Sequence, residues 1–186
     1  SSDVCSSDLV VRAPDTGRVL AVETRYADPA LNGKVKTNTQ GDKTGAPWCS
    51  DWRRFAAARK VVLVESAINA LSVDSCALQG VAAVSTQGAG NVRNMDWRMF
   101  LGKTVILAFD NDKPEEQGAL AGFCPGLYWA WKAHEALHAL DIPCLMLDAD
   151  DWKTDDDELI NDLNDILQER GVDGLSAALK KLEPWL

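Results

Sequence analysis

Short apolar runs alternate along this chain with segments in which apolar residues recur every three or four positions. The runs cover residues 61–64, 81–84, 105–109 and 142–147, and an acidic or hydroxyl side chain follows each one directly. Short β-branched runs are typical of strands buried on both faces, whereas the wider spacing predicts amphipathic helices. The alternation therefore predicts an α/β fold with a mainly parallel sheet.

Helical spacing predicts the elements that cover this sheet. One pattern begins at Ala67, directly after the first run, and another at residues 127–140 connects the last two runs. Parallel strands need such crossover connections, which are usually helices. Further helices are expected at residues 48–60, 95–101 and 172–182.

The first third of the chain has the pattern of a polar hairpin. Residues 17–26 and 34–39 have strand character, and Asp-Pro and Asn-Gly pairs, which favour turns, lie between them. Residues 40–47 are expected to form a loop. Residues 1–9 contain two similar serine-rich stretches without periodicity, so we interpret them as an artefact or scar and leave them out of the fold. On this interpretation the chain is a fragment.

Two carboxylates, Asp110 and Asp112, follow the third apolar run. Residues i and i+2 of an extended backbone point to the same side, so the two side chains can face one small volume beyond the strand. Like charges at that distance repel each other unless a cation lies between them, and Mg²⁺ is the hard cation that oxygen ligands favour. The alternative is a helix cap or a turn.

Glu65 follows the first apolar run in the same way and precedes a helical pattern. Parallel strands end at one edge of their sheet, which is also where open α/β sheets bind ligands. Glu65 is therefore expected close to Asp110 and Asp112. The alternative is an acid at a helix N-terminus, where the helix dipole favours it.

The order and spacing of three motifs resemble the Toprim domain, which bacterial-type primases, topoisomerases, small ribonucleases and recombination mediators share. The motifs are Glu65, Ser85-Thr86-Gln87-Gly88 and Asp110-Asn111-Asp112, within residues 60–170. The resemblance implies a Rossmann-like sheet of about four mainly parallel strands with flanking helices, preceded by a small β-rich basic segment. The chain departs from the family at Ser66, where glycine is usual, and at Asn69, where an acid is frequent.

The resemblance also implies a division of the chain and a set of site residues. Residues 10–59 would be a partial primase-like N-terminal segment, and residues 60–186 a Toprim domain with an insertion at 114–126 and C-terminal helices. Glu65, Asp110 and Asp112 would be catalytic and, with Asp162, would bind Mg²⁺ or Mn²⁺; Asp165 is the next candidate. Arg25 and Lys36, and also Lys34, would contact nucleotide or template. Helix capping by Asp162 and a merely solvated hairpin stay open as alternatives.

The function implied by the resemblance is that of a primase-like nucleotidyltransferase. Such an enzyme makes RNA primers on single-stranded DNA from nucleoside triphosphates, here in the replication of a mobile element and together with a replicative helicase. A Toprim nuclease is one alternative. The other is a non-catalytic scaffold that binds DNA or a partner, an alternative kept open by Ser66 and Asn69.

Charge and cysteine content refine this picture. Net charge is −9, yet residues 1–60 carry ten Lys or Arg against seven Asp or Glu, whereas residues 114–186 carry five against sixteen. That polarity suits a basic part that holds phosphates and an acidic part that holds metal, and it equally suits a stable domain with a solvated acidic tail. Five scattered cysteines, no secretory signal and no apolar run near ~20 residues favour a cytoplasmic protein without membrane contact.

The segment His134-Glu135-Ala136-Leu137-His138 matches the H-E-x-x-H pattern of zinc proteases. The apolar spacing around it favours an ordinary crossover helix with its histidines toward solvent.

Overall fold

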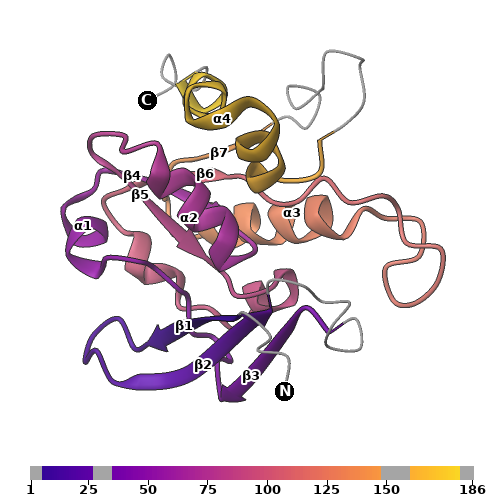
Figure 1. The fold of residues 1–186 in the computed structure, drawn as a ribbon, viewed down its shortest axis with the longest axis horizontal. Coiled ribbons are helices and arrows are strands. Elements are labelled where there is room, and N and C mark those ends of the chain that lie inside the picture. Colours follow the sequence, from indigo (N-terminus) through magenta and orange to yellow (C-terminus); the bar gives the residue numbers. More distant parts are fainter. Residues whose placement is uncertain (1–5, 27–34, 148–159, 181–186) are drawn as a thin grey trace.

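The computed structural model describes residues 6–26, 35–147 and 160–180, which form two sheets and the helices around the larger one (Figure 1). The first sheet is antiparallel with the order β1-β2-β3; its strands are β1 (Ser6–Arg12), β2 (Val19–Tyr26) and β3 (Thr37–Gly41). The hairpin pairing of β2 with β3 is the one that the sequence predicted. Residues 6–9, which we left out of the fold, form the first half of β1 and pair with residues 23–26.

The larger sheet has four parallel strands in the order β5-β4-β6-β7, which confirms the predicted fold class. Its strands are β4 (Lys60–Val64), β5 (Val81–Ser85), β6 (Thr104–Leu107) and β7 (Cys144–Met146). Because all four run in one direction, their carboxyl ends meet at one edge of the sheet.

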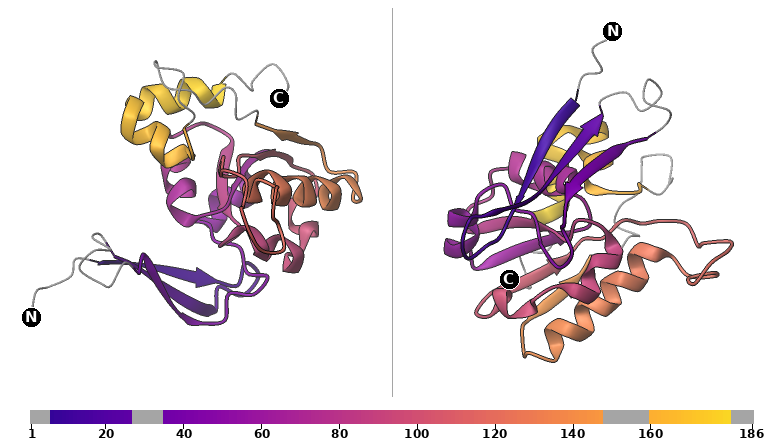
Figure 2. Two further views of the ribbon diagram at one scale, coloured as in Figure 1. Left: turned by 90° about the vertical axis from the view of Figure 1, so that its right-hand side faces the viewer. Right: turned by 90° about the horizontal axis from the view of Figure 1, so that it is seen from below.

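Helices cover both faces of the larger sheet (Figures 1 and 2). α2 and α4 lie on one face, and α1, the 3₁₀ turns η2 and η3, and α3 on the other. Their bounds are α1 (Trp52–Ala57), α2 (Ala67–Ser75), η2 (Ala89–Asn94), η3 (Trp97–Phe100), α3 (Pro125–His138) and α4 (Leu163–Lys180).

Strand alternation divides the core into two apolar layers. Val61 and Leu63 of β4 face the α3 side, whereas Val62 and Val64 face α2 and α4, and all four are at most 1 % exposed. Burial of each such side chain contributes about 1.5–3 kcal/mol. This two-sided burial explains why residues 61–64 of β4 are all apolar.

Two helix predictions differ from the structure. The helix expected at residues 48–60 is only α1, because the Asp51 side chain caps it by accepting the backbone N–H groups of Arg53 and Arg54. The helix expected at residues 95–101 is replaced by the short turn η3. The last predicted helix is the part of α4 that follows Gly171, whose φ of 69° separates it from a helical segment at residues 163–170 that we did not predict.

The small sheet is attached to the carboxyl edge of β5. Trp48, in the linker after β3, exchanges two backbone hydrogen bonds of 2.8 Å with Ser85. Val11 of β1 and Ala21 of β2 are buried in the same apolar layer as α2 and α4. The small sheet is therefore part of the core and lies beside the edge where the candidate site residues are.

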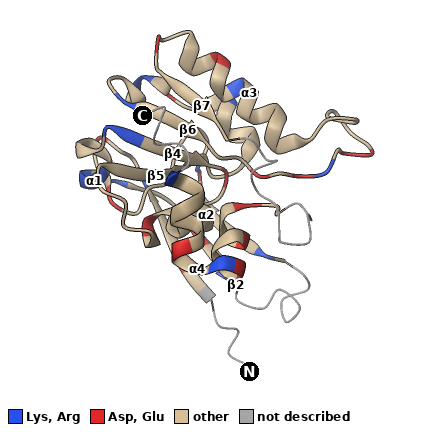
Figure 3. Cartoon of the chain, turned by 90° about the horizontal axis from the view of Figure 1, so that it is seen from above, with Lys and Arg blue, Asp and Glu red and all other residues tan. Residues whose placement is uncertain are grey.

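Charged residues are spread over several elements of the described part (Figure 3). Basic residues lie on and beside α1, and α4 carries both basic and acidic residues. In the described residues, no helix is long and apolar enough to cross a membrane.

Candidate functional site

Glu65 and Asp110 meet at the carboxyl edge of the larger sheet. Glu65 directly follows β4, and Asp110 follows the neighbouring strand β6 after two residues. The Glu65 Oε1 atom accepts the backbone N–H of Asp110 at 3.2 Å, and Glu65 is only 9 % exposed. The structure thus brings together the two acids that the parallel-strand argument placed at one edge.

Burial and mutual repulsion disfavour the ionised form of both acids. Burial, followed by the charges of Asp112 and Asp162, raises the pKa of Glu65 to about 7 against the hydrogen bond from Asp110. Burial, followed by the charge of Glu65, raises the pKa of Asp110 to about 8. Strongly perturbed carboxylates at a sheet edge are typical of functional sites.

Asp112 and Asp162 lie at the periphery of this pair. Both are partly exposed, and both raise the pKa values of Glu65 and Asp110 through their charge. Asp162 also caps α4, since its Oδ1 accepts the backbone N–H of Asp165 at 2.9 Å. Asp165 itself is exposed, and burial and Asp162 raise its pKa. Asp162 therefore has the capping role that we left open, in a position where its charge also acts on the site.

Asn69 is a site residue that sequence reasoning treated only as a departure. It is 1 % exposed on α2, and its Nδ2 donates to the Asp110 Oδ1 at 2.9 Å. Its Oδ1 accepts the backbone N–H of Asn164 at 3.1 Å. Asn69 therefore fixes the Asp110 carboxylate and ties it to the start of α4. Its position four residues after Glu65, where the family frequently has an acid, was the available signal.

Ser66 begins α2 as its N-cap. Its side chain accepts the Asn69 N–H at 3.2 Å, and its φ of −110° is ordinary for any residue. The turn after Glu65 therefore does not need glycine here.

Gly126 brings α3 against the site. A Cβ atom at this position would lie 1.9 Å from the Asp110 carbonyl oxygen and 2.9 Å from the Glu65 Oε1. Only glycine allows the first turn of α3 to approach both acids so closely. Sequence reasoning placed this glycine at the end of the insertion and did not assign it a role.

The carboxylate group fits a divalent cation in its donor chemistry. Among the residues that the structure describes, no three His, Cys, Asp or Glu side chains are gathered as a complete ion-binding cluster. Glu65 and Asp110 are nevertheless hard oxygen donors, with Asp112 and Asp162 close enough to act on them electrostatically. A cation would favour the ionised forms that burial and repulsion disfavour.

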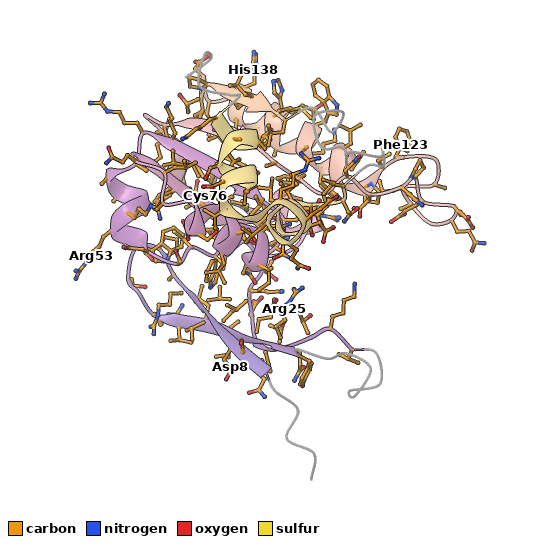
Figure 4. All side chains as sticks on the ribbon, turned by 45° about the horizontal axis from the view of Figure 1, so that its top comes forward. Asp8, Arg25, Arg53, Cys76, Phe123 and His138 are labelled. Atoms are coloured by element: carbon orange, nitrogen blue, oxygen red, sulfur yellow. The ribbon has the colours of Figure 1, made fainter. Side chains whose placement is uncertain are left out.

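The basic candidates of the small sheet differ in their placement. Arg25 shares a face of β2 with the buried Ala21 and Glu23, and Figure 4 shows it on the side of the small sheet that faces the larger body. Lys36 is exposed and lies opposite Tyr26, hence on the other face. Lys34 lies outside the described residues.

The insertion expected at residues 114–126 is a projecting loop at residues 114–124 (Figures 1 and 2), because α3 already begins at Pro125. Glu115 and Phe123 are joined by a backbone hydrogen bond of 3.0 Å, and Gly122 donates back to Glu115 at 2.9 Å. The helix that follows is α3, which connects β6 to β7 as predicted. His134 and His138 stack along it with ring centroids 6.1 Å apart.

Comparisons with known proteins agree with this architecture. The family described as the Toprim domain matches residues 60–173. No curated protein sequence is similar enough to count as a match.

Several solved primase structures share the fold over nearly the whole chain. The primase fragment of the bacteriophage T7 primase-helicase protein is 17 % identical with a TM-score of 0.64, over 96 % of this chain and 64 % of that one. A DNA primase domain from Pseudomonas aeruginosa is 15 % identical with a TM-score of 0.60, over 95 % and 50 %. The DnaG primase catalytic domain bound to ssDNA is 16 % identical with a TM-score of 0.62, over 95 % and 51 %. This chain thus spans between half and two thirds of those chains.

Proposed function

Because this chain belongs to the Toprim domain family, we propose that it carries out primase-like, metal-dependent nucleotidyl transfer on a single-stranded DNA template. The observation that carries the proposal is the pairing of Glu65 with Asp110 at the carboxyl edge, beside a small sheet that directs Arg25 toward the same body. The matched primase structures include the small sheet as well as the Toprim part, since they cover 95–96 % of this chain. That coverage favours primase-like transfer over a Toprim nuclease.

In this proposal Glu65, Asp110, Asp112 and Asp162 hold Mg²⁺ or Mn²⁺. A bound ion of this kind neutralises triphosphate charge and stabilises the attacking and leaving oxygens. Glu65 would complete the metal site or act as general acid or base beside the metal. Asn69 and the start of α3 fix the geometry of Asp110.

The basic residues would hold the nucleic acid and the nucleotide. Arg25 would contact phosphate on the inner face of the small sheet. Lys36, on the opposite face, and Lys34, outside the described residues, stay candidates for further contacts with nucleotide or template. Nucleoside triphosphates and single-stranded DNA are the proposed substrates, and a replicative helicase of a mobile element is the proposed partner.

The test is a primer-synthesis assay with ribonucleoside triphosphates, single-stranded template and Mg²⁺. We expect Asp110→Asn and Asp112→Asn to abolish synthesis and to weaken Mg²⁺ binding measured by calorimetry. Asp173→Asn makes the same chemical change on an exposed part of α4 and serves as the matched control. Full synthesis by either site variant would overturn the assignment. Metal-dependent cleavage of labelled nucleic acid without synthesis would support the nuclease instead.

A further inference from the structure

Gln87 is buried without satisfying its amide. The side chain is 7 % exposed, and within the described part of the chain neither its Nε2 nor its Oε1 has a hydrogen-bond partner. Its φ of 62° lies in the left-handed region, which residues other than glycine rarely adopt. An unsatisfied buried amide destabilises the folded state, and a strained backbone adds to that cost. Such a combination is typical of residues kept for function.

The backbone around Gln87 is anchored to the candidate site. The Ser85 Oγ accepts the Gln87 N–H at 2.9 Å and donates to the Glu65 carbonyl at 2.8 Å. The Gly88 N–H donates to the same carbonyl at 2.9 Å. These hydrogen bonds hold Gln87 in its strained conformation and connect its backbone, through Ser85, to the Glu65 carbonyl.

Gln87 lines a cavity of about 350 Å³ between the linker after β3 and the turn η2. The Asn91 Nδ2 donates to the carbonyls of Lys43 and Thr86, and its Oδ1 accepts the Gly45 N–H. Asn91 thus joins the two sides of the cavity, and all its side-chain polar atoms already have hydrogen-bond partners. The other polar lining residues are Lys43, Thr44, Arg93 and Asn94, and no acid is among them.

The cavity offers positive charge to a ligand. Arg93 forms no salt bridge within the described residues, and its guanidinium lies 4.9 Å from the Trp129 ring centre. Lys43 pairs with Glu23 from the small sheet at 2.5 Å. An anion between Lys43 and Arg93 would therefore meet two cations, of which Arg93 is unpaired within the described residues and Lys43 is shared with the Glu23 carboxylate.

We propose that this cavity binds one nucleotide of a single-stranded nucleic acid, with its phosphate between Lys43 and Arg93 and its base hydrogen-bonded to Gln87. The three rotatable bonds of Gln87 allow its amide to turn into the cavity that it lines. Adenine presents an acceptor and a donor side by side, which match the amide of glutamine in a bidentate pair. Gln87 would then give the protein a preference for adenine beside the metal site. This inference rests on the proposed function for its substrate class.

The experiment measures binding of labelled oligo-dA and oligo-dC by fluorescence anisotropy, in EDTA so that no metal contributes. We expect the unaltered protein to bind oligo-dA about tenfold more tightly, as one good bidentate pair allows. Gln87→Leu removes both amide atoms at similar volume and should bring the two affinities together. Equal affinities in the unaltered protein, or a preference that survives in Gln87→Leu, would overturn the proposal.

Two further variants separate phosphate contact from base contact. Arg93→Ala should weaken binding of both oligonucleotides equally. It should also reduce the slope of the logarithm of the binding constant against the logarithm of salt concentration by about one. Arg53→Ala, on the exposed side of α1 (Figure 4), is the matched control and should change neither affinity nor slope. An Arg93→Ala protein that keeps the slope of the unaltered protein would overturn the phosphate assignment.

Thermal unfolding without oligonucleotide checks the cost assigned to Gln87. Gln87→Leu should melt at a higher temperature, because it removes an unsatisfied amide. A lower melting temperature would show that the amide is already hydrogen-bonded and would overturn the inference. Because these measurements use neither metal nor nucleotide addition, a failed primer-synthesis assay leaves them intact, and their failure leaves the proposed catalysis intact.

Discussion

Replacing Glu65 by glutamine should stabilise the protein at alkaline pH, at the expense of its metal site. Glutamine keeps the shape of the side chain and the oxygen that accepts the Asp110 N–H, but it carries no charge. Burial raises the pKa of Glu65 from 4.5 to about 7, and a shift of that size corresponds to about 3 kcal/mol. The same substitution removes the largest charge contribution that raises the pKa of Asp110.

The sign follows from proton binding. Because the folded protein holds these protons more tightly than the unfolded chain, its stability falls as pH rises from 3.8, the ordinary pKa of Asp110, to about 8. Below that window both states are protonated and the penalty vanishes. Above it both acids are ionised in both states and the whole penalty applies. Glu65→Gln should therefore lose less stability over the window than the unaltered protein does.

Urea unfolding in EDTA at pH 5, 6, 7 and 8, followed by tryptophan fluorescence, measures this directly. We expect the unaltered protein to lose a few kcal/mol between pH 5 and pH 8, and Glu65→Gln to exceed it by about 2–3 kcal/mol at pH 8. Asp173→Asn, at an exposed position of α4, should leave the dependence of stability on pH as it is in the unaltered protein. Stability that rises with pH, or a slope that Glu65→Gln leaves unchanged, would refute the reasoning.

Three further predictions test other parts of the site. Adding Mg²⁺ at 100 times its Kd at pH 8 should stabilise the unaltered protein by about 2.7 kcal/mol and leave Asp110→Asn unchanged; equal shifts in melting temperature would count against the metal assignment. Gly126→Ala should lower stability by about 1–3 kcal/mol and abolish Mg²⁺ binding, because its Cβ would overlap the Asp110 carbonyl. The control Gly90→Ala, whose Cβ would have no atom nearer than 3.8 Å, should change neither the melting temperature nor the Mg²⁺ affinity measured by calorimetry. Arg25→Ala should raise the KM for template or nucleotide with little change in stability, and an unchanged KM in the primer assay would remove Arg25 from the site.

The sequence predicted the centre of the site because that centre depends on a general rule. Parallel buried strands end at one edge, so Glu65 and Asp110 had to be neighbours once both runs were recognised as strands. The hairpin and the crossover helix α3 were also predicted from local residue patterns, and both were confirmed.

The residues that support the site depend on contacts that spacing does not encode. Gly126 is separated from Asp110 by the insertion, and its role follows only from how closely α3 approaches β6. Gln87 belongs to a recognised motif, but the cavity that it lines is completed by Lys43 and Thr44, which are distant in sequence. Residues 6–9 lack a hydrophobic pattern, yet their backbone pairs with residues 23–26 of β2 and Leu9 packs against the apolar layer of α2 and α4.

The two departures from the family pattern were the reason to keep a non-catalytic scaffold open, and the structure gives each a local function. Ser66 caps α2, which keeps the backbone after Glu65 in an ordinary conformation. Asn69 donates to Asp110 where an acid would have added a further negative charge to an already repelling group. Ser66 thus begins the helix that carries Asn69, and Asn69 fixes the Asp110 carboxylate. Both departures are therefore compatible with the proposed metal site. Asn69→Leu should accordingly weaken Mg²⁺ binding by freeing Asp110, and a variant with unaltered affinity would show that Asp110 needs no such support.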